Sequence, residues 1–128
     1  MRAIALILAV AGIAPLAPAT AASDKFAFEY RVERADAGRL SVPACLATAQ
    51  RASAQLGYVP MTAKTYPGQL AVFAAGPRGG GGSLTVYCIA VERKTAFVVQ
   101  ALDYSRPQSV AAKRAADAVH QALLKAGR

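Results

Sequence analysis

Hydrophobic and polar residues alternate without a break from Lys25 to Glu33. An alternation with a period of two is typical of a half-buried strand, and it is common in antiparallel sheets. We therefore expect a strand here, with its apolar side packed in the core: Phe26, Phe28, Tyr30 and Val32. The opposite, solvent-facing side carries Lys25, Glu29, Arg31 and Glu33. A short polar turn follows.

Two later segments have the spacing of amphipathic helices. Ser41 can cap a helix that begins near Pro43, runs to Leu56 and ends at Gly57. Its apolar stripe consists of Cys45, Ala49, Ala52 and Leu56. The second helix is expected to open with a capping box formed by Ser105 and Gln108 around Pro107, and to reach about Lys125. Its buried stripe consists of Ala112, Ala116, Val119 and Leu123.

Between the helices lie three strand-like segments, at residues 69–75, 84–92 and 95–102. Tyr58–Gly68, which contains Pro60 and Pro67, has the composition of a connector. The order β-α-β-β-β-α predicts an α+β fold: a two-layer sandwich with a four-stranded, mainly antiparallel sheet and both helices on one face. The first strand can pair with either the second or the fourth strand.

The first residues have the pattern of an export signal. Arg2 precedes an apolar segment from Ala3 to Ile13, and small residues follow it. We expect a cleavable signal peptide at residues 1–21, cut after Ala21, and a single domain at 22–128 in the periplasm or outside the cell. The alternative is a membrane-anchoring helix, although the segment is too short to span a bilayer. No later segment has transmembrane length.

The two cysteines, Cys45 and Cys88, are expected to form a disulfide, because exported proteins fold in an oxidising compartment. This bridge orients the sheet. If Cys88 reaches a helix, the residues directly before and after it on its strand face away from the helices, and so does every second residue counted from these. A two-residue turn at Arg93 and Lys94 would pair Cys88 with Val99 and extend this assignment to the next strand.

The side without helices then carries Tyr87, Ile89, Val91, Val98, Gln100 and Leu102. This set is too apolar for a solvent-facing surface, so we interpret it as an interaction face for a second copy of the chain or for an apolar ligand. A three-residue turn or a bulge would instead place the same residues in the core.

Composition narrows the chemistry. The 128 residues include 15 basic, 7 acidic and one histidine, for a net charge of +8 that falls to +7 without the signal peptide. With so few carboxylates and imidazoles, we expect no catalytic residues, no metal site and no cofactor. Asp117 and His120 can meet on the last helix, and the glycines at 79–82 form a loop without the lysine of a phosphate-binding motif. Candidate contacts to an anionic envelope component are Arg78, Lys113 and Arg114.

The expected function is that of a small, exported, non-enzymatic binding module of the cell envelope. One alternative is a secreted enzyme with a pocket around His120 and Asp117. Another is an enzyme inhibitor that presents an ordered loop such as Tyr58–Gly68. A third is a polyanion-binding protein, which needs its basic residues gathered on one face. The sequence contains no recognised nucleic-acid-binding motif, which disfavours nucleic acid as a partner.

Overall fold

The computed structural model describes residues 25–128. The predicted signal peptide and its cut after Ala21 lie outside these residues. The described chain forms five strands and two helices in the order β-α-β-β-β-β-α. The elements are β1 (Ala27–Asp36), α1 (Val42–Gln55), β2 (Tyr58–Tyr66), β3 (Leu70–Pro77), β4 (Gly82–Val91), β5 (Lys94–Asp103) and α2 (Val110–Ala126).

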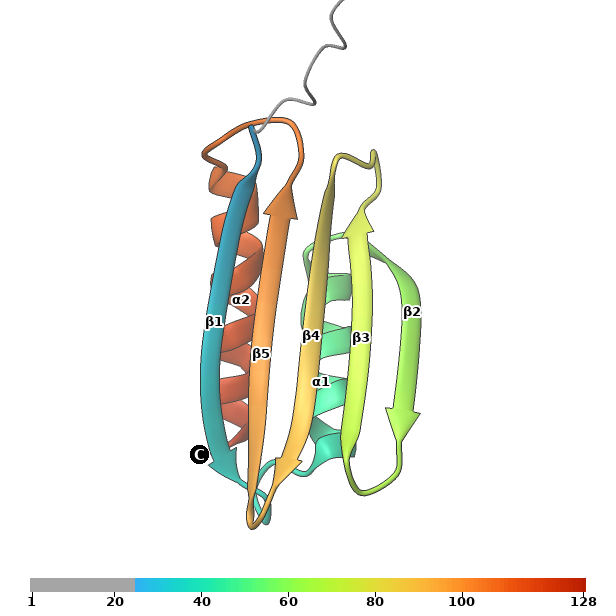
Figure 1. Cartoon of the computed structure of the whole chain (residues 1–128), viewed down its shortest axis with the longest axis vertical. Helices are drawn as coiled ribbons and strands as arrows, with labels where there is room; N and C mark the ends of the chain where they lie inside the picture. The colour runs from blue at the N-terminus through green and yellow to red at the C-terminus, as the bar shows by residue number, and fades with distance from the viewer. Residues whose placement is uncertain (1–24) are drawn as a thin grey trace, which may run out of the picture.

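The strands form one sheet in the order β1-β5-β4-β3-β2, and every neighbouring pair is antiparallel. Both helices lie on the same face of this sheet, α2 behind β1 and β5 and α1 behind β4 and β3 (Figure 1). The sequence left two places for the first strand. It pairs with β5, at the edge of the sheet opposite to β2.

The prediction of four strands is wrong, because the segment predicted as a connector forms the fifth strand, β2. Proline lacks the N–H group of a sheet ladder and is tolerated mainly on edge strands, which is where β2 lies. Its register with β3 shifts between Pro60 and Thr62. Every residue of β2 after Tyr58 is exposed, so the strand has no alternation of buried and exposed positions that a sequence pattern could reveal. The segment Tyr58–Gly68 is mostly a strand, and it does not form the ordered loop expected of an enzyme inhibitor.

The first helix begins and ends as predicted, whereas the second begins later. The amide of Ala44 donates a hydrogen bond to the Ser41 hydroxyl, and Gly57 after the helix has a φ of 78°. In α2 the cap is Ser109, which accepts from the amide of Ala112 at 3.0 Å. The predicted capping box is wrong because the Ser105 hydroxyl binds the Asp103 carboxylate instead.

The core lies between the sheet and the two helices. Its largest buried side chains are Phe73, Phe97, Leu40, Leu84 and Leu123. The predicted stripe of α2 is buried throughout, and in α1 Cys45, Ala49 and Ala52 are buried while Leu56 is partly buried. Small alanines dominate both helices, which lets their backbones pack close to the sheet.

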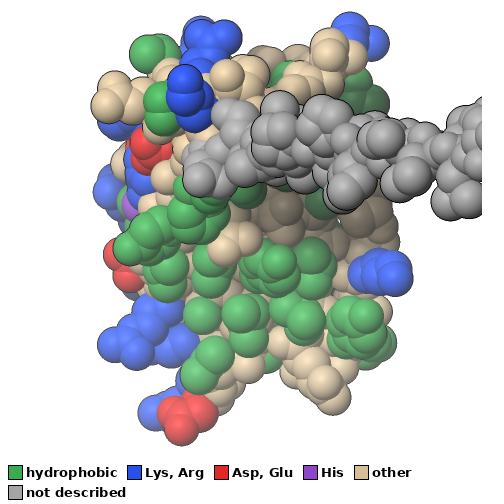
Figure 2. Space-filling view, turned by 45° about the horizontal axis from the view of Figure 1, so that its top comes forward, with side chains coloured by type: hydrophobic (Ala, Val, Ile, Leu, Met, Phe, Trp, Pro, Cys, Tyr) green, Lys and Arg blue, Asp and Glu red, His purple; other side chains and the backbone are tan. Residues whose placement is uncertain are grey.

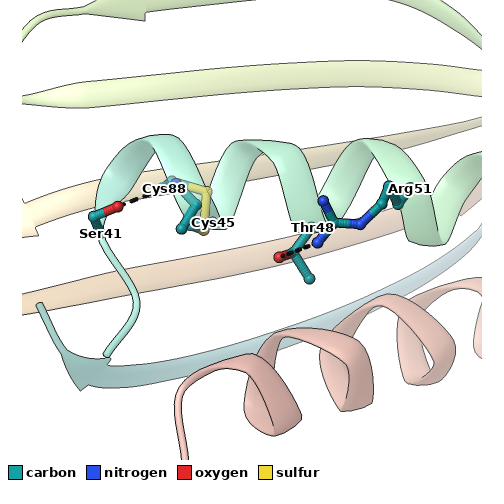
Figure 3. The surroundings of a disulfide bond; sticks show 6 residues. Ser41, Cys45, Thr48, Arg51 and Cys88 are labelled. Atoms are coloured by element: carbon teal, nitrogen blue, oxygen red, sulfur yellow. Dashed lines mark hydrogen bonds between the residues drawn. A yellow bond between two sulfur atoms is a disulfide. The ribbon is translucent and has the colours of Figure 1, made fainter. Parts of the chain in front are cut away.

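A disulfide between Cys45 and Cys88 links α1 to the central strand β4, with an S–S distance of 2.02 Å (Figure 3). Both cysteines are buried, at 0% and 1% exposure, so the bridge lies inside the core. The predicted pairing is confirmed. Cys88 faces the helices, so the residues directly before and after it on β4 face the other side of the sheet.

The register of the β4–β5 hairpin differs from the prediction. Val91 lies opposite Lys94, and Cys88 lies opposite Phe97 rather than Val99. The turn consists of Glu92 and Arg93, and Glu92 has a φ of 55°. The predicted pairing was displaced by two residues, and a displacement of two leaves every side chain on the face that was assigned to it.

Loss of the disulfide is expected to destabilise the protein strongly. Closing a loop across 43 residues lowers the entropy of the unfolded chain, which corresponds to about 4 kcal/mol as an upper-end figure. We expect a Cys45→Ser/Cys88→Ser variant to lose about 2–4 kcal/mol in free energy of unfolding, measured by urea titration. The reduced wild-type protein is the control and should lose a similar amount. Equal stability of the oxidised and reduced proteins would contradict the prediction.

Candidate functional site

Strand β1 turns its apolar side away from the helices, against expectation. Phe28, Tyr30 and Val32 are 47%, 59% and 59% exposed on the face of the sheet that carries no helix. The rings of Phe28 and Tyr30 stack there, with centroids 5.7 Å apart. Phe26, just before the strand, is also half exposed. The alternation of β1 was recognised, but its assignment of the apolar side to the core is wrong.

The reason is an ionic cluster between β1 and α2. On the helix side of β1, the Arg31 guanidinium donates to the Asp117 carboxylate of α2, with Nη2–Oδ1 at 2.6 Å and Nε–Oδ1 at 3.0 Å. Arg31 also pairs with Glu29, and Lys113 binds the other oxygen of Asp117 at 2.6 Å. The partners Arg31 and Asp117 are 86 residues apart, so a local pattern cannot show which side of β1 the last helix covers.

Side chains that lie next to one another on adjacent strands form rows across the side without helices, which we call the open face. Read from β1 to β2, the central row is Val32, Val98, Tyr87, Val72 and Lys64. The row below it in Figure 1 is Arg34, Ala96, Ile89, Leu70 and Tyr66. The row above it is Tyr30, Gln100, Thr85, Ala74 and Thr62. Phe28, Leu102 and Ser83 continue the face at its upper end.

All six residues that the sequence assigned to an interaction face lie on the open face. Val91 is 49% exposed, whereas Tyr87, Ile89, Val98, Gln100 and Leu102 are partly buried by one another and by their neighbours on adjacent strands. The structure adds the apolar side chains of the flanking strands, which sequence reasoning missed: Phe28, Tyr30, Val32, Leu70, Val72 and Tyr66. Leu70 and Val72 alternate along β3 with Ala71 and Phe73, and all four residues are apolar. This sequence pattern indicates a strand that is apolar on both sides of the sheet.

Charged groups of the open face lie at its margins. Figure 2 shows hydrophobic side chains gathered over the strands, with Lys and Arg side chains around them. At one end, the Lys94 ammonium lies 3.7 Å from the Asp36 carboxylate. Arg34 on edge strand β1 and Lys64 on edge strand β2 form no ion pair with any other residue of 25–128. The face thus has an apolar centre and a rim that is mainly basic.

The three candidate anion contacts do not form one site. Arg78 lies in the turn after β3, and Lys113 is neutralised by Asp117. Arg114 lines a cavity of about 630 Å³ beside the end of α1 and the start of α2, together with Tyr58, Asp103 and Arg106. Nothing brings Arg78 into this lining. The three residues thus lie in separate places on the structure.

The carboxylate in this cavity is held by its own loop. Asp103 accepts hydrogen bonds from the Ser105 hydroxyl at 2.5 Å and the Ser105 amide at 2.9 Å, and Arg106 lies 3.4 Å away. Hydrogen bonds from Ser105 and Ser109 lower the pKa of Asp103 to about 2. Burial, with a smaller contribution from the charge of Asp103, raises the pKa of Tyr58. This arrangement orders the connection into α2 and keeps Asp103 ionised.

The expected meeting of Asp117 and His120 gives way to other contacts. Asp117 is bound by Lys113 and Arg31, whose hydrogen bonds lower the pKa of its carboxyl. The His120 ring lies against Phe97, with centroids 6.1 Å apart. The carboxylate is thus engaged by two cations, and the imidazole is a packing group at the sheet–helix interface.

Among residues 25–128, no helix is both long and apolar enough to cross a membrane. Residues 25–128 match DUF6180, a family of unknown function, and the chain therefore belongs to this family. A comparison with curated proteins finds no match. The family covers all of the described fold, including both helices and all five strands of the sheet.

The low pKa of Asp103 predicts acid sensitivity. Because its folded-state pKa of about 2 lies below the value of about 3.9 in an unfolded chain, ionised Asp103 stabilises the fold above about pH 4. This contribution is lost as the pH falls towards 2. We expect Asp103→Asn to flatten the decline of unfolding free energy between pH 4 and 2, measured by urea titration. The residual slope reports Asp36 and Asp117, whose pKa values are also lowered. A carboxyl resonance of Asp103 that titrates near pH 4 by NMR would contradict the prediction.

Proposed function

We propose that this protein is a non-enzymatic binding module of the cell envelope that contacts its partner through the open face of its sheet. One observation carries the proposal: the centre of the open face is apolar from β1 to β3, and neither helix covers it. Both sides of the sheet are therefore apolar, but the chain between residues 25 and 128 packs a layer of helices on one side alone.

The energetic argument is that such a face is costly in water. Burial of apolar surface contributes about 25 cal/mol per Å², and monomeric proteins rarely expose contiguous apolar patches beyond a few hundred Å². Five strands at about 4.8 Å spacing and four rows of side chains give the whole open face, polar positions included, a flat area of about 650 Å². Covering a large part of it would stabilise a complex by several kcal/mol even after the entropy cost of association.

The envelope assignment has two supports. The predicted signal peptide directs the chain out of the cytoplasm. The buried Cys45–Cys88 bridge is consistent with folding in an oxidising compartment, where disulfides form and persist. The bridge is structural, because it lies in the core and joins two elements that the packing already places together.

The proposal predicts that a photo-reactive phenylalanine analogue at position 28 will cross-link to a partner in envelope extract. Phe28 suits this role because it is half exposed on the open face, and the analogue keeps its aromatic ring. The matched control is the same analogue at Gln121, an exposed position on α2. We expect adducts, detected by mass shift on gels, at position 28 and none at position 121.

Loss of binding should follow from a charge in the open face. In the position-28 protein, Val98→Lys should reduce the adduct at least tenfold because the ammonium group is desolvated in the interface. Gln121→Lys adds the same charge on the helix side and should leave the adduct unchanged. Far-ultraviolet circular dichroism checks that both variants fold. Equal adducts at positions 28 and 121, or adducts that persist with Val98→Lys, would overturn the proposal.

A further inference from the structure

We propose that the open face binds a second copy of this chain, so that two sheets pack face to face about a two-fold axis. This inference rests on the proposed function, since it names the partner of the same surface. The product is a four-layer dimer with helices outside and two sheets inside. Three features of the open face support it: the order of residues in its rows, the position of its charges, and its area.

Each row of side chains can face the same row of a second copy, read in the opposite direction, with compatible side chains. Strand β4 is central in the sheet, with β5 and β1 on one side and β3 and β2 on the other. A two-fold axis parallel to β4 and above it places β4 on β4, β5 on β3 and β1 on β2 of the second copy. In the central row, Tyr87 then meets Tyr87, and Val98 meets Val72 of the second copy. Both of these contacts are between apolar or aromatic groups.

The row below it pairs large side chains with small ones. Ile89 meets Ile89 at the axis, and Ala96 lies opposite Leu70 of the second copy. A large residue facing a small one lets the side chains of two sheets interdigitate at the spacing of about 10 Å that packed sheets adopt. The row therefore provides complementary volume as well as apolar chemistry.

The charges of the open face lie at the rim of this arrangement. Arg34 lies at one edge of the sheet and Lys64 at the other, in different rows. Reversal brings Arg34 over Tyr66 of the second copy, where a guanidinium can stack on the ring. Lys64 comes over Val32, where its aliphatic stem packs and its ammonium reaches solvent at the rim. Lys64 of the second copy then lies at the same edge as Arg34, one row away, so both charged ends must extend into solvent at the rim.

The area matches that of a stable dimer. The flat area of about 650 Å² underestimates the accessible surface because side chains roughen it, and a standard protein interface buries about 800 Å² per partner. A sheet with one uncovered apolar face most commonly buries that face against a helix layer or another sheet. A second copy supplies such a sheet without any further component.

A protein surface fits the open face better than a lipid surface does. The row of Tyr30, Gln100, Thr85, Ala74 and Thr62 places hydroxyl and amide groups across the face. In hydrocarbon these groups would lack hydrogen-bond partners, at a cost of several kcal/mol each. In the proposed dimer, Thr85 meets Thr85 at the axis and Tyr30 meets Thr62, so that hydroxyl groups face hydroxyl groups. Only Gln100, which lies opposite Ala74, has no polar group directly across from it.

The first test is the mass of the oxidised, exported protein in solution, by sedimentation equilibrium over a range of micromolar concentrations. We expect a dimer. Val98→Lys should raise the dimer dissociation constant at least a hundredfold, whereas Gln121→Lys on the outer surface of α2 should leave it unchanged. A monomer at all concentrations would overturn the inference, and so would a dimer that Val98→Lys leaves intact.

A second test examines the two-fold arrangement itself. Because Val98 faces Val72 of the second copy, Val98→Asp and Val72→Lys should each be monomeric alone. Mixed in equal amounts, they should form a heterodimer that pairs the aspartate with the lysine on one side of the axis and valine with valine on the other. Val98→Asp mixed with Val98→Lys is the control, since these positions do not face each other. Equal recovery in both mixtures would overturn the arrangement.

The two proposals can fail separately. A monomeric protein that still forms Val98-dependent adducts at position 28 with a different protein refutes the dimer and retains the binding module. Binding of the monomer to vesicles of phosphatidylethanolamine and phosphatidylglycerol (7:3), lost in Val98→Lys, also refutes the dimer and identifies lipid as the partner. Adducts that contain two copies of this chain support both proposals.

Discussion

The disulfide between Cys45 and Cys88 is the constraint on which the arrangement of the sheet depends. It fastens the first turns of α1 to the inner side of the central strand, so Cys88 must face the helices. Strand geometry then assigns alternate residues of β4 to opposite sides, and the hydrogen-bonded neighbours β3 and β5 inherit the same assignment. One covalent bond therefore determines which side of three strands is buried against helices and which stays open.

The ionic cluster of Arg31, Asp117, Glu29 and Lys113 has the same role for β1. A strand with one charged and one apolar side normally exposes the charged side. Here the charged side faces α2, where Arg31 finds a carboxylate, and the apolar side joins the open face. The mutual pairing of these charges offsets the cost of placing them at a partly buried interface. The cost is also limited because Arg31 lies at the edge of the sheet and retains 23% side-chain exposure. The result is a continuous apolar surface from β1 to β3.

Much of the fold could be predicted from local patterns, and the errors have physical causes. Periodicity located both helices and four of the strands, and the disulfide oriented β4 and β5 correctly even though the predicted register was displaced by two residues. Strand β2 was missed because an edge strand exposed on both sides has no alternation of burial. The orientation of β1 was missed because it depends on a contact with Asp117 in the last helix. About half of the open face was therefore identifiable, namely the strands that the disulfide orients.

An apolar face on a molecule with a net charge of +8 has a consequence for its behaviour in solution. Electrostatic repulsion keeps basic molecules apart, while the open face draws apolar surfaces together. Salt weakens the repulsion, because the screening length falls from about 30 Å at 0.01 M to about 10 Å at 0.1 M, and it leaves hydrophobic contact intact. Rising ionic strength should therefore favour association of this protein, which is opposite to the behaviour of assemblies held by surface ion pairs. At low ionic strength the molecules would stay apart, and the dissociation constant of the proposed dimer would fall as the ionic strength of the surroundings rises.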